Sequence, residues 1–571
     1  MLRWPRLRCT AVFAIAFATR VLGEQPPEEA EVARRVSALV AGIASIGTGS
    51  WLELVRWFDG VLLGANVTGS LPREWPATEM VLMHPGVPSQ NSLRLSHGEV
   101  AAGEGFVFVP CAAGLTTTTA LESGLRPALE AMLQSGEGPL PKRDVLALSL
   151  VWEVLHLSAS PFKEFLLALP AVNVGVRPIL DLHRAASTAS AAFPNSLQTA
   201  TLAKLLHASK RVAEAAKSAE LETTRVVRAA DAYLLPLLAE EIAGKDEAAS
   251  LAARLRGMVG TVATWACDVV ASRSWAADPC GTSPSNPQLT GADHVLLPLV
   301  DQLHHDAALG GHLEVWPNTH GRQIGWFVRN GRRTRRAGAE LFANNAGAFV
   351  CNADSAAHSG FTAKSSSFDC FVLKLSVGQE QHVEEIVLRD GDLLPQALLA
   401  TIRRGRQAVV QDAACETPFK EALEAGQPLS MESELKALRQ LRTFLKLQLE
   451  AQVDRQEDLR TMELLDGPQA AARIPIDYAA LTGLAGRGST ALQDILAVLR
   501  GERRILEDAI SALDKMWLQF LVSGDSESRD KNWKTVVATH PASSDGQGCV
   551  AEDWYPLTAK PSAQAHSLEK K

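Results

Sequence analysis

The stretch His294-Val-Leu-Leu-Pro-Leu-Val-Asp301-Gln-Leu-His304-His305 is an apolar run that ends in an Asp-x-x-His-His loop. A short continuous apolar run bounded by polar residues is typical of a buried strand. Two further strand-like segments follow it. The block then closes on Cys351-Asn352-Ala-Asp-Ser-Ala-Ala-His358-Ser359-Gly360-Phe361, a polar loop that leads into Ser-Gly-Phe. The sequence therefore predicts short strands joined by polar loops that carry candidate ligand-binding side chains.

A pair of strands is predicted well before this block. The stretch Asn91-Ser-Leu93-Arg-Leu95-Ser alternates apolar and polar residues, which is the pattern of a half-buried strand. Gly103-Glu104-Gly105-Phe-Val-Phe-Val109-Pro110 predicts a turn followed by a short buried strand that proline stops.

Helical patterns fill most of the remaining chain. Residues from about 120 to 271 are predominantly helical in pattern, and they include the phrases Ser160-Pro-Phe-Lys-Glu-Phe165-Leu-Leu-Ala-Leu169-Pro170 and Val262-Ala-Thr-Trp265-Ala266-Cys-Asp-Val-Val270-Ala-Ser272-Arg273. After one more strand at 371–375, leucines spaced three and four apart from Leu435 to Leu449 mark one apolar face of a helix. The segment from about residue 523 is rich in Ser, Asp, Lys and Gly, which predicts disorder.

In this order, these motifs resemble the SET-domain protein methyltransferases of the Rubisco large-subunit lysine methyltransferase class. The phrase at 160–170 resembles that class's Ser-x-Trp-x-Pro-Tyr-x-x-x-Leu-Pro signature, and the one at 262–273 resembles its Trp-Ala-x-x-x-Val-x-Ser-Arg helix. Arg500-Gly501-Glu502-Arg-Arg-Ile505-Leu506 resembles the Arg-x-Gly-Glu-x-x-Ile-Leu helix of its substrate-binding domain. The motif His358-Ser359-Gly360-Phe361 comes closest to the branch that methylates a histidine of actin.

The resemblance implies an α+β fold. We expect a small β-rich SET core within residues 50–385, with a helical insertion at about 120–271. An all-helical substrate-binding domain at 386–522 and a disordered tail at 523–571 would follow.

The same resemblance implies S-adenosylmethionine as the cofactor and a protein or peptide as the substrate. Arg273 would hold the cofactor carboxylate, and His305 would contribute to the adenine site. His304 stands where the family has asparagine, and one ring nitrogen could accept a bond from the cofactor amino group if the ring is neutral. Ser359 and Phe361 belong to the expected cofactor loop, with Phe361 beside the adenine. Each of these side chains also has an ordinary structural reading, as a helix-end cation, a loop histidine or a core aromatic.

The chain departs from the family at two places. Family members carry a tyrosine at the channel mouth, whereas no tyrosine occurs between Val295 and Phe361, and Asn345 or Ala346 falls at that position. The glycines of the first strand turn are replaced by Gln90-Asn91-Ser92. Two hypotheses therefore stay open: a lysine or histidine N-methyltransferase with altered motifs, or a catalytically inactive SET-fold module that binds proteins or peptides.

The first 23 residues form a separate segment. Three arginines precede the apolar run Ala11-Val-Phe-Ala-Ile-Ala-Phe-Ala18, which predicts a secretory signal peptide. An organelle transit peptide is the alternative, and the protein is cytoplasmic if the leader is not used. The sequon Asn66-Val67-Thr68 fits a secretory route. The eight cysteines show no Cys-x-x-Cys spacing. Cys267–Cys280 or Cys351–Cys370 could pair, but we expect buried free thiols.

The remaining sequence features exclude several classes of protein. A net charge of −8 over 571 residues is mild and argues against general nucleic-acid binding. A metal site built from Asp301, His304, His305 and His312 is a minor alternative, because adjacent histidines rarely converge on one ion. We therefore predict no metal site and no stable transmembrane segment. Phosphate-binding loops, Gly-x-Ser-x-Gly elbows and dinucleotide fingerprints are absent from the sequence.

Overall fold

The structure is a computed structural model of the 571-residue chain. It describes residues 27–64, 80–83, 92–95, 98–135, 138–172, 176–177, 179–180, 183–184, 209–278, 280, 288–306, 310–317, 323–344, 351–360, 362, 368–377, 382–404, 431–452 and 488–522. The expected leader, the sequon at Asn66 and the tail at 523–571 lie outside these residues.

The chain divides into two compact units. The first comprises Met1–Asp181, Ala215–Val350 and Ala357–Gly360, and the second comprises Leu182–Glu214, Cys351–Ala356 and Phe361–Lys571. The chain thus passes between the two units more than once, and the short stretch Ala357–Gly360 groups with the first unit.

The first unit combines helices with short strands. Its helices are α2 (Pro27–Ser45), α3 (Trp51–Gly64), α4 (Thr117–Glu122), α5 (Arg126–Gln134), α6 (Lys142–Leu155), α7 (Lys163–Ala168), most of α10 (Lys210–Ala229), the π-helical η3 (Ala230–Leu234), α11 (Leu235–Ala243) and α12 (Ala248–Arg273), with short 3-10 turns η2 (Cys111–Ala113) and η4 (Val300–Gln302). Its strands are β1 (Met80–Met83), β2 (Ser92–Leu95), β3 (Glu99–Val100), β4 (Gly105–Pro110), β5 (Leu115–Thr116), β6 (Leu140–Pro141), β7 (Trp275–Ala276), β8 (Leu289–Thr290), β9 (His294–Leu296), β10 (His304–His305), β11 (Leu313–Pro317), β12 (Gln323–Arg329), β13 (Arg335–Arg336) and β14 (Phe342–Ala343).

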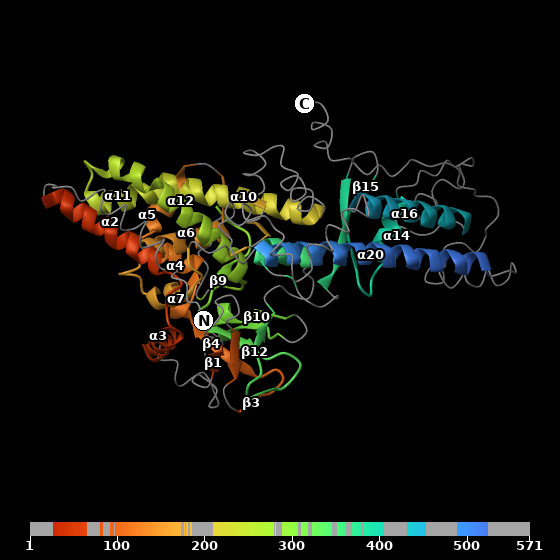
Figure 1. The fold of residues 1–571 in the computed structure, drawn as a ribbon, viewed down its shortest axis with the longest axis horizontal. Coiled ribbons are helices and arrows are strands. Elements are labelled where there is room, and N and C mark those ends of the chain that lie inside the picture. Colours follow the sequence, from red (N-terminus) through yellow and green to blue (C-terminus); the bar gives the residue numbers. More distant parts are fainter. Residues whose placement is uncertain are drawn as a thin grey trace. The chain divides into compact units, whose positions relative to one another are not determined.

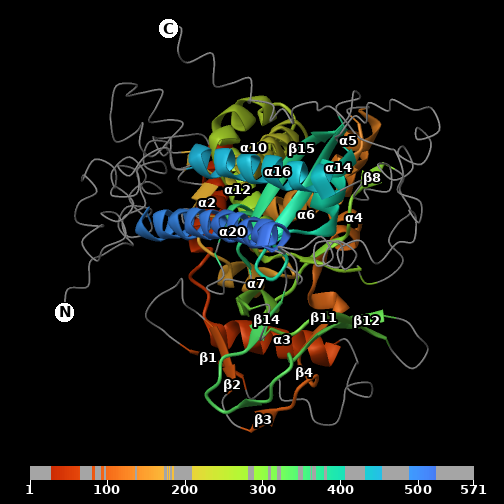
Figure 2. The same cartoon turned by 90° about the vertical axis from the view of Figure 1, so that its right-hand side faces the viewer.

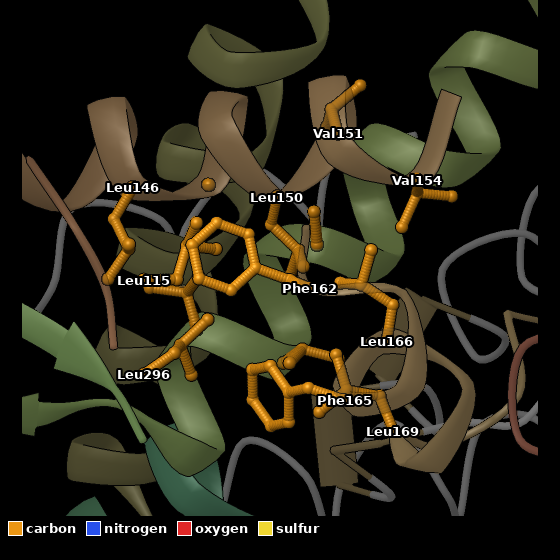
Figure 3. Packing of buried hydrophobic residues seen from close by; sticks show 14 of the residues in the cluster. Leu115, Leu146, Leu150, Val151, Val154, Phe162, Phe165, Leu166, Leu169 and Leu296 are labelled. Carbon is orange, nitrogen blue, oxygen red and sulfur yellow. The ribbon is translucent and has the colours of Figure 1, made fainter. Parts of the chain in front are cut away.

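The helices of the first unit pack around α6. Its residues 145–151 are all buried, because α12 and α4 pack against it together with β5 and β9. The space below α6 is filled by α7 and its two ends, through the side chains of Phe162, Phe165, Leu166 and Leu169 (Figure 3). The Ser-Pro-Phe phrase at 160–170 therefore serves the core of this unit.

The strands form small separate sheets rather than one large sheet. Strands β11, β12 and β4 are antiparallel neighbours in that order, as are β5, β9 and β7, and β10 pairs in parallel with β14. Strands β1–β4, β11 and β12 gather in one part of the unit (Figure 2). The strand at 105–110 was predicted from its sequence, and its residues 106–110 are buried.

The second unit has its own core. It contains β15 (Cys370–Val377), β16 (His382–Arg389), α14 (Gln396–Arg404), α16 (Met431–Gln452), α20 (Gly488–Val522), α13 (Asn352–Asp354) and the start of η5 (Ser355–Ser359). Strands β15 and β16 form an antiparallel pair, and α16 runs beside α20 (Figure 1). The predicted apolar face of α16 is confirmed, since Leu438, Leu441 and Leu445 are buried in this core.

The two compact units cut the chain at a different place from the expected boundary at residue 385. Strands β15 and β16 lie in the second unit because Phe371, Leu373 and Leu388 share a core with α14, α16 and α20. The resemblance placed the predicted strand at 371–375 in the SET core and set the boundary inside what is β16. The domain boundaries expected from the resemblance stay a prediction.

The expectation of free thiols is wrong for four cysteines. Cys111 is bonded to Cys280, and Cys351 to Cys370. The alternative Cys351–Cys370 pairing was therefore right, whereas Cys267–Cys280 was wrong. Cys267 is a free, buried thiol on α12, and burial raises its pKa. Within the described residues, no helix is both long and apolar enough to cross a bilayer.

We expect both disulfides to survive purification without reductant, and the Cys111–Cys280 bridge to matter most for stability. It joins residues 169 apart in sequence, and closing so long a loop in the unfolded chain corresponds to roughly 3–5 kcal/mol. Peptide mapping under alkylating, non-reducing conditions should recover both linked peptide pairs. The Cys111→Ser/Cys280→Ser variant should lose stability by that amount in urea unfolding, with Cys267→Ala as the control that leaves both bridges. Recovery of Cys111 and Cys280 as alkylated thiols from folded protein would contradict the assignment.

Candidate functional site

The Asp-x-x-His-His loop is tied to the end of α12 by an ion pair. Arg273 is the last residue of that helix, and its Nη1 donates to the backbone oxygen of Asp301 at 2.8 Å and to Asp301 Oδ2 at 3.2 Å. The Asp301 side chain is fully buried, while 26% of the Arg273 side chain is exposed. A carboxylate without access to water needs such a partner. The pair therefore fixes where both residues lie.

The backbone before Asp301 takes an unusual conformation. Leu299 has φ 70° and ψ −45°, and it is the one non-glycine with positive φ in the described part of the chain. This geometry is close to a γ-turn of the rare, strained kind. The turn leads directly into η4, which directs Asp301 inward, where burial raises the pKa of its carboxyl to about 6 despite the opposing effect of Arg273.

The two histidines form strand β10, and this strand lies beside the segment that precedes the family's tyrosine position. His304 is in register with Phe342, and His305 with Ala343. The amide of Asp306 donates to Ala343 O at 3.1 Å, which extends the pairing by one residue. The chain then continues into Asn344 and on to Asn345 and Ala346, which both lie outside the described residues.

The two histidines point to opposite sides of this local sheet, since successive strand residues alternate in direction. His305 is in register with Ala343, which is buried, and the nearby Leu341, Leu93 and Leu95 are buried as well. His304 lies on the other side, where its Nδ1 contacts Glu340 Oε1 at 2.6 Å. His304 is therefore the exposed member of the pair, and His305 is half-buried.

Two glycines allow the loop after the histidines to fold back against β14 and the end of β12. A Cβ on Gly310 would lie 2.3 Å from Asp306 O, and one on Gly311 would lie 1.4 Å from Arg329 O. The amide of Gly311 donates to Phe342 O, and Asn344 donates back to Gly311 O at 2.7 Å. Any side chain at Gly311 would thus separate the strands that hold the candidate site.

The structure describes only some of the other expected site residues. The backbone of Ser359 lies in η5, and Ala357–Gly360 groups with the unit that carries Arg273 and His304. Phe361 lies outside the described residues, so its expected place beside an adenine stays a prediction. Ser92 begins β2, and this strand runs antiparallel to β1 where the family glycines were expected.

Some contacts of this site had no signal in the sequence. Glu340 has no motif around it that indicates a role, and its contact with His304 depends on pairing between distant segments. Arg94 of β2 forms an antiparallel bridge with Glu340, and its Nη1 donates to Gly338 O at 3.4 Å. The segment after β12 does not form a hairpin with it: β13 pairs with β3, and Asn330 Nδ2 donates to Val100 O, Ala101 O and Arg333 O.

The metal alternative finds no supporting geometry among the described residues. No group of three or more His, Cys, Asp or Glu side chains is placed there to hold an ion. Asp301 is paired with Arg273, and His304 and His305 face opposite ways.

Known proteins resemble this chain in structure rather than in sequence. No protein-family model and no curated protein matches it. The SET domain of LSMT bound to lysine and AdoHcy matches with a TM-score of 0.51 at 13% identity, over 85% of this chain and 99% of that one. Rubisco LSMT bound to sinefungin and monomethyllysine gives a TM-score of 0.48 at 13% identity, over 84% of this chain and 99% of that one.

The chain has the α+β fold of SET methyltransferases. The LSMT likeness spans nearly the whole of that SET-domain structure, which confirms the fold class expected from the sequence. At this level of identity the likeness extends to the fold alone.

The Asp301 carboxyl should make stability depend on pH between about 4 and 6. Its pKa is about 6 in the folded chain against an ordinary value of 3.8, so the folded state binds more protons in this range and stability falls as pH rises. The difference corresponds to about 3 kcal/mol. Asp301→Asn cannot release this proton, so the variant should gain stability relative to wild type by this amount between pH 4 and pH 7. Urea unfolding of both proteins at each pH gives the difference in their free energies of unfolding, in which the effects of the other carboxylates cancel. A difference that stays constant with pH would contradict the assignment.

Proposed function

We propose that this protein binds S-adenosylmethionine in the SET fold and acts as a protein N-methyltransferase with altered motifs. One observation carries the proposal. Three parts expected from sequence to form the cofactor site are physically joined: Arg273 is bonded to Asp301 of the histidine loop, and β10 pairs with the strand that leads to the family's tyrosine position.

The chemistry of these side chains fits the zwitterionic end of the cofactor. The partly exposed Arg273 supplies a cation. Within the described residues its hydrogen bonds to Asp301 run through Nη1, so Nε and Nη2 can meet a carboxylate. Two buried acceptors, Oδ1 of Asp301 and Oδ1 of Asn344, have no hydrogen-bond partner among the described residues. Buried oxygens of this kind suit an ammonium group, because leaving them unpaired is costly.

Each residue then has a role in holding the cofactor. Arg273 would bind the carboxylate through a charge-assisted fork, and Asp301 would keep the guanidinium in place. His304 would accept from the amino group, while His305, Ser359 and Phe361 would form the adenine side. The bound cofactor would supply a methyl group on a sulfonium.

Transfer of that methyl group requires little acid–base chemistry from the protein. The chain must hold a deprotonated nitrogen in line with the methyl carbon and exclude water. The SET domain of LSMT holds lysine together with AdoHcy, which supports a lysine or histidine side chain of a protein as the acceptor here. Asn345 or Ala346 would stand at the channel mouth, where neither offers an aromatic wall.

That substitution favours a second candidate function. Only Tyr233, Tyr478 and Tyr555 occur in the whole chain, and none belongs to the expected channel. A SET-fold module that binds a protein or peptide without transferring a methyl group would need no tyrosine.

We also propose that the chain matures in an oxidising compartment, reached through the N-terminal leader. The two disulfides support this, because structural disulfides persist mainly in secreted and organellar proteins. The leader-like composition of residues 1–23 points the same way.

Titration calorimetry tests the cofactor proposal directly. We expect saturable binding of S-adenosylmethionine and at least a tenfold weaker affinity in Arg273→Lys, since a hydrogen bond to a charged group is worth about 1.5–3 kcal/mol. Lysine keeps a cation beside Asp301 and so spares the fold, but it lacks the bidentate fork. Arg332→Lys, at an exposed position outside the site, is the matched control and should bind like wild type.

A methyl-transfer assay on a lysate with labelled cofactor then separates the two functions. Label on a protein lysine or histidine supports the enzyme, whereas cofactor binding without transfer supports the module. Folded protein that gives no binding heat would contradict the cofactor proposal.

A further inference from the structure

Four side chains share the outer side of the sheet that carries the histidines. Glu340 and Phe342 are two residues apart on one extended segment, Arg94 bridges Glu340 from β2, and His304 is in register with Phe342 from β10. Register partners and residues two apart point the same way. The opposite side of the same segments carries the buried Leu93, Leu95 and Leu341. The outer side therefore presents an acid, an aromatic ring and a cation around one histidine.

The contact between His304 and Glu340 fixes the position of a proton. An ionised carboxylate can only accept hydrogen bonds, so the 2.6 Å contact of Glu340 Oε1 requires a hydrogen on Nδ1 of His304. When the ring is neutral, Nε2 then has no hydrogen and carries a free lone pair. A carboxylate that sets a histidine tautomer through one nitrogen and thereby assigns the role of the other is well known at metal and catalytic sites.

We propose that Glu340 is a positioning residue that locks His304 in the Nδ1–H form, so that Nε2 accepts a hydrogen bond from the ammonium group of the cofactor. In the family, an asparagine oxygen is expected at this position. A histidine can replace that oxygen only if its outward nitrogen is an acceptor. Glu340 meets this requirement. The inference rests on the proposed function, because the ammonium belongs to S-adenosylmethionine.

The neighbouring groups are consistent with this arrangement. Arg94 is in register with Glu340, and its Nη1 donates to Gly338 O on the same segment. Phe342 has Arg335 over its ring at 5.4 Å from the centroid, so that aromatic side chain is engaged by another cation. His305, on the inner side, is the only other titratable side chain of β10.

Nitrogen-15 NMR of the imidazole rings tests the tautomer without any cofactor. Above pH 8, where imidazole is neutral, the His304 signals of the folded protein should show a protonated Nδ1 and an unprotonated Nε2. Glu340→Gln keeps the volume, but an amide can donate as well as accept, so the tautomer should become mixed. Glu314→Gln is the matched control, because Glu314 is an exposed acid that pairs with Arg329 instead; it should leave the His304 pattern unchanged.

Two ligands then separate this inference from the proposed function. S-adenosylhomocysteine has the ammonium group, and 5′-methylthioadenosine lacks it while keeping the adenosine and sulfur. Glu340→Gln should weaken S-adenosylhomocysteine about tenfold and leave 5′-methylthioadenosine unchanged. In a His304→Asn background, Glu340→Gln should have no effect on either ligand, because an asparagine oxygen needs no tautomer.

Each outcome decides a different statement. If neither ligand binds wild type, the proposed function fails, and with it the ammonium role of His304. If both bind but Glu340→Gln weakens them equally, or acts as strongly in the His304→Asn background, Glu340 has only a structural role. A protonated Nε2 in wild type would overturn the inference whatever the ligands do.

Discussion

The bond between Arg273 and Asp301 is the constraint on which the candidate site depends. It joins the end of a buried helix to a loop 28 residues further on, and it places a fully buried carboxylate next to a partly exposed cation. Neither group would be stable there alone, since a buried charge without its partner costs several kcal/mol. The strained turn at Leu299 is held by the same arrangement, because its buried side chain and Asp301 belong to one short loop.

The small sheet beside this ion pair gives the two adjacent histidines different environments. Alternation along β10 sends His305 towards the core and His304 outward to Glu340. Gly310 and Gly311 let the following loop return against β14 and Arg329. The departures from the SET pattern at residues 304 and 345 therefore differ in kind. The histidine is accommodated by a specific acid, whereas neither candidate for the tyrosine position, Asn345 or Ala346, supplies an aromatic ring.

Sequence alone predicted the α+β class and the main elements, because these depend on local patterns. The run 105–110, the helix ending at Arg273 and the leucines of α16 each show their pattern within one short stretch of sequence. Contacts between distant segments could not be predicted from the sequence. Cys111 and Cys280 are 169 residues apart, and nothing near either cysteine indicates the other. Glu340 could not be assigned to His304 without the pairing of β10 with β14. The strand at 371–375 was placed with the SET core by resemblance, yet the core that β15 and β16 share with α14, α16 and α20 puts both strands in the second unit.

The central claim is that Arg273, the histidine loop and the strand at 342–343 together form one cofactor site. Hydrogen–deuterium exchange with and without saturating S-adenosylmethionine tests it most directly. Our account predicts slower exchange of the amides at 301–306 and 342–344, the two segments that pair in β10 and β14, with little change in β15, β16 and α16. Binding accompanied by protection elsewhere and none in these two segments would contradict it.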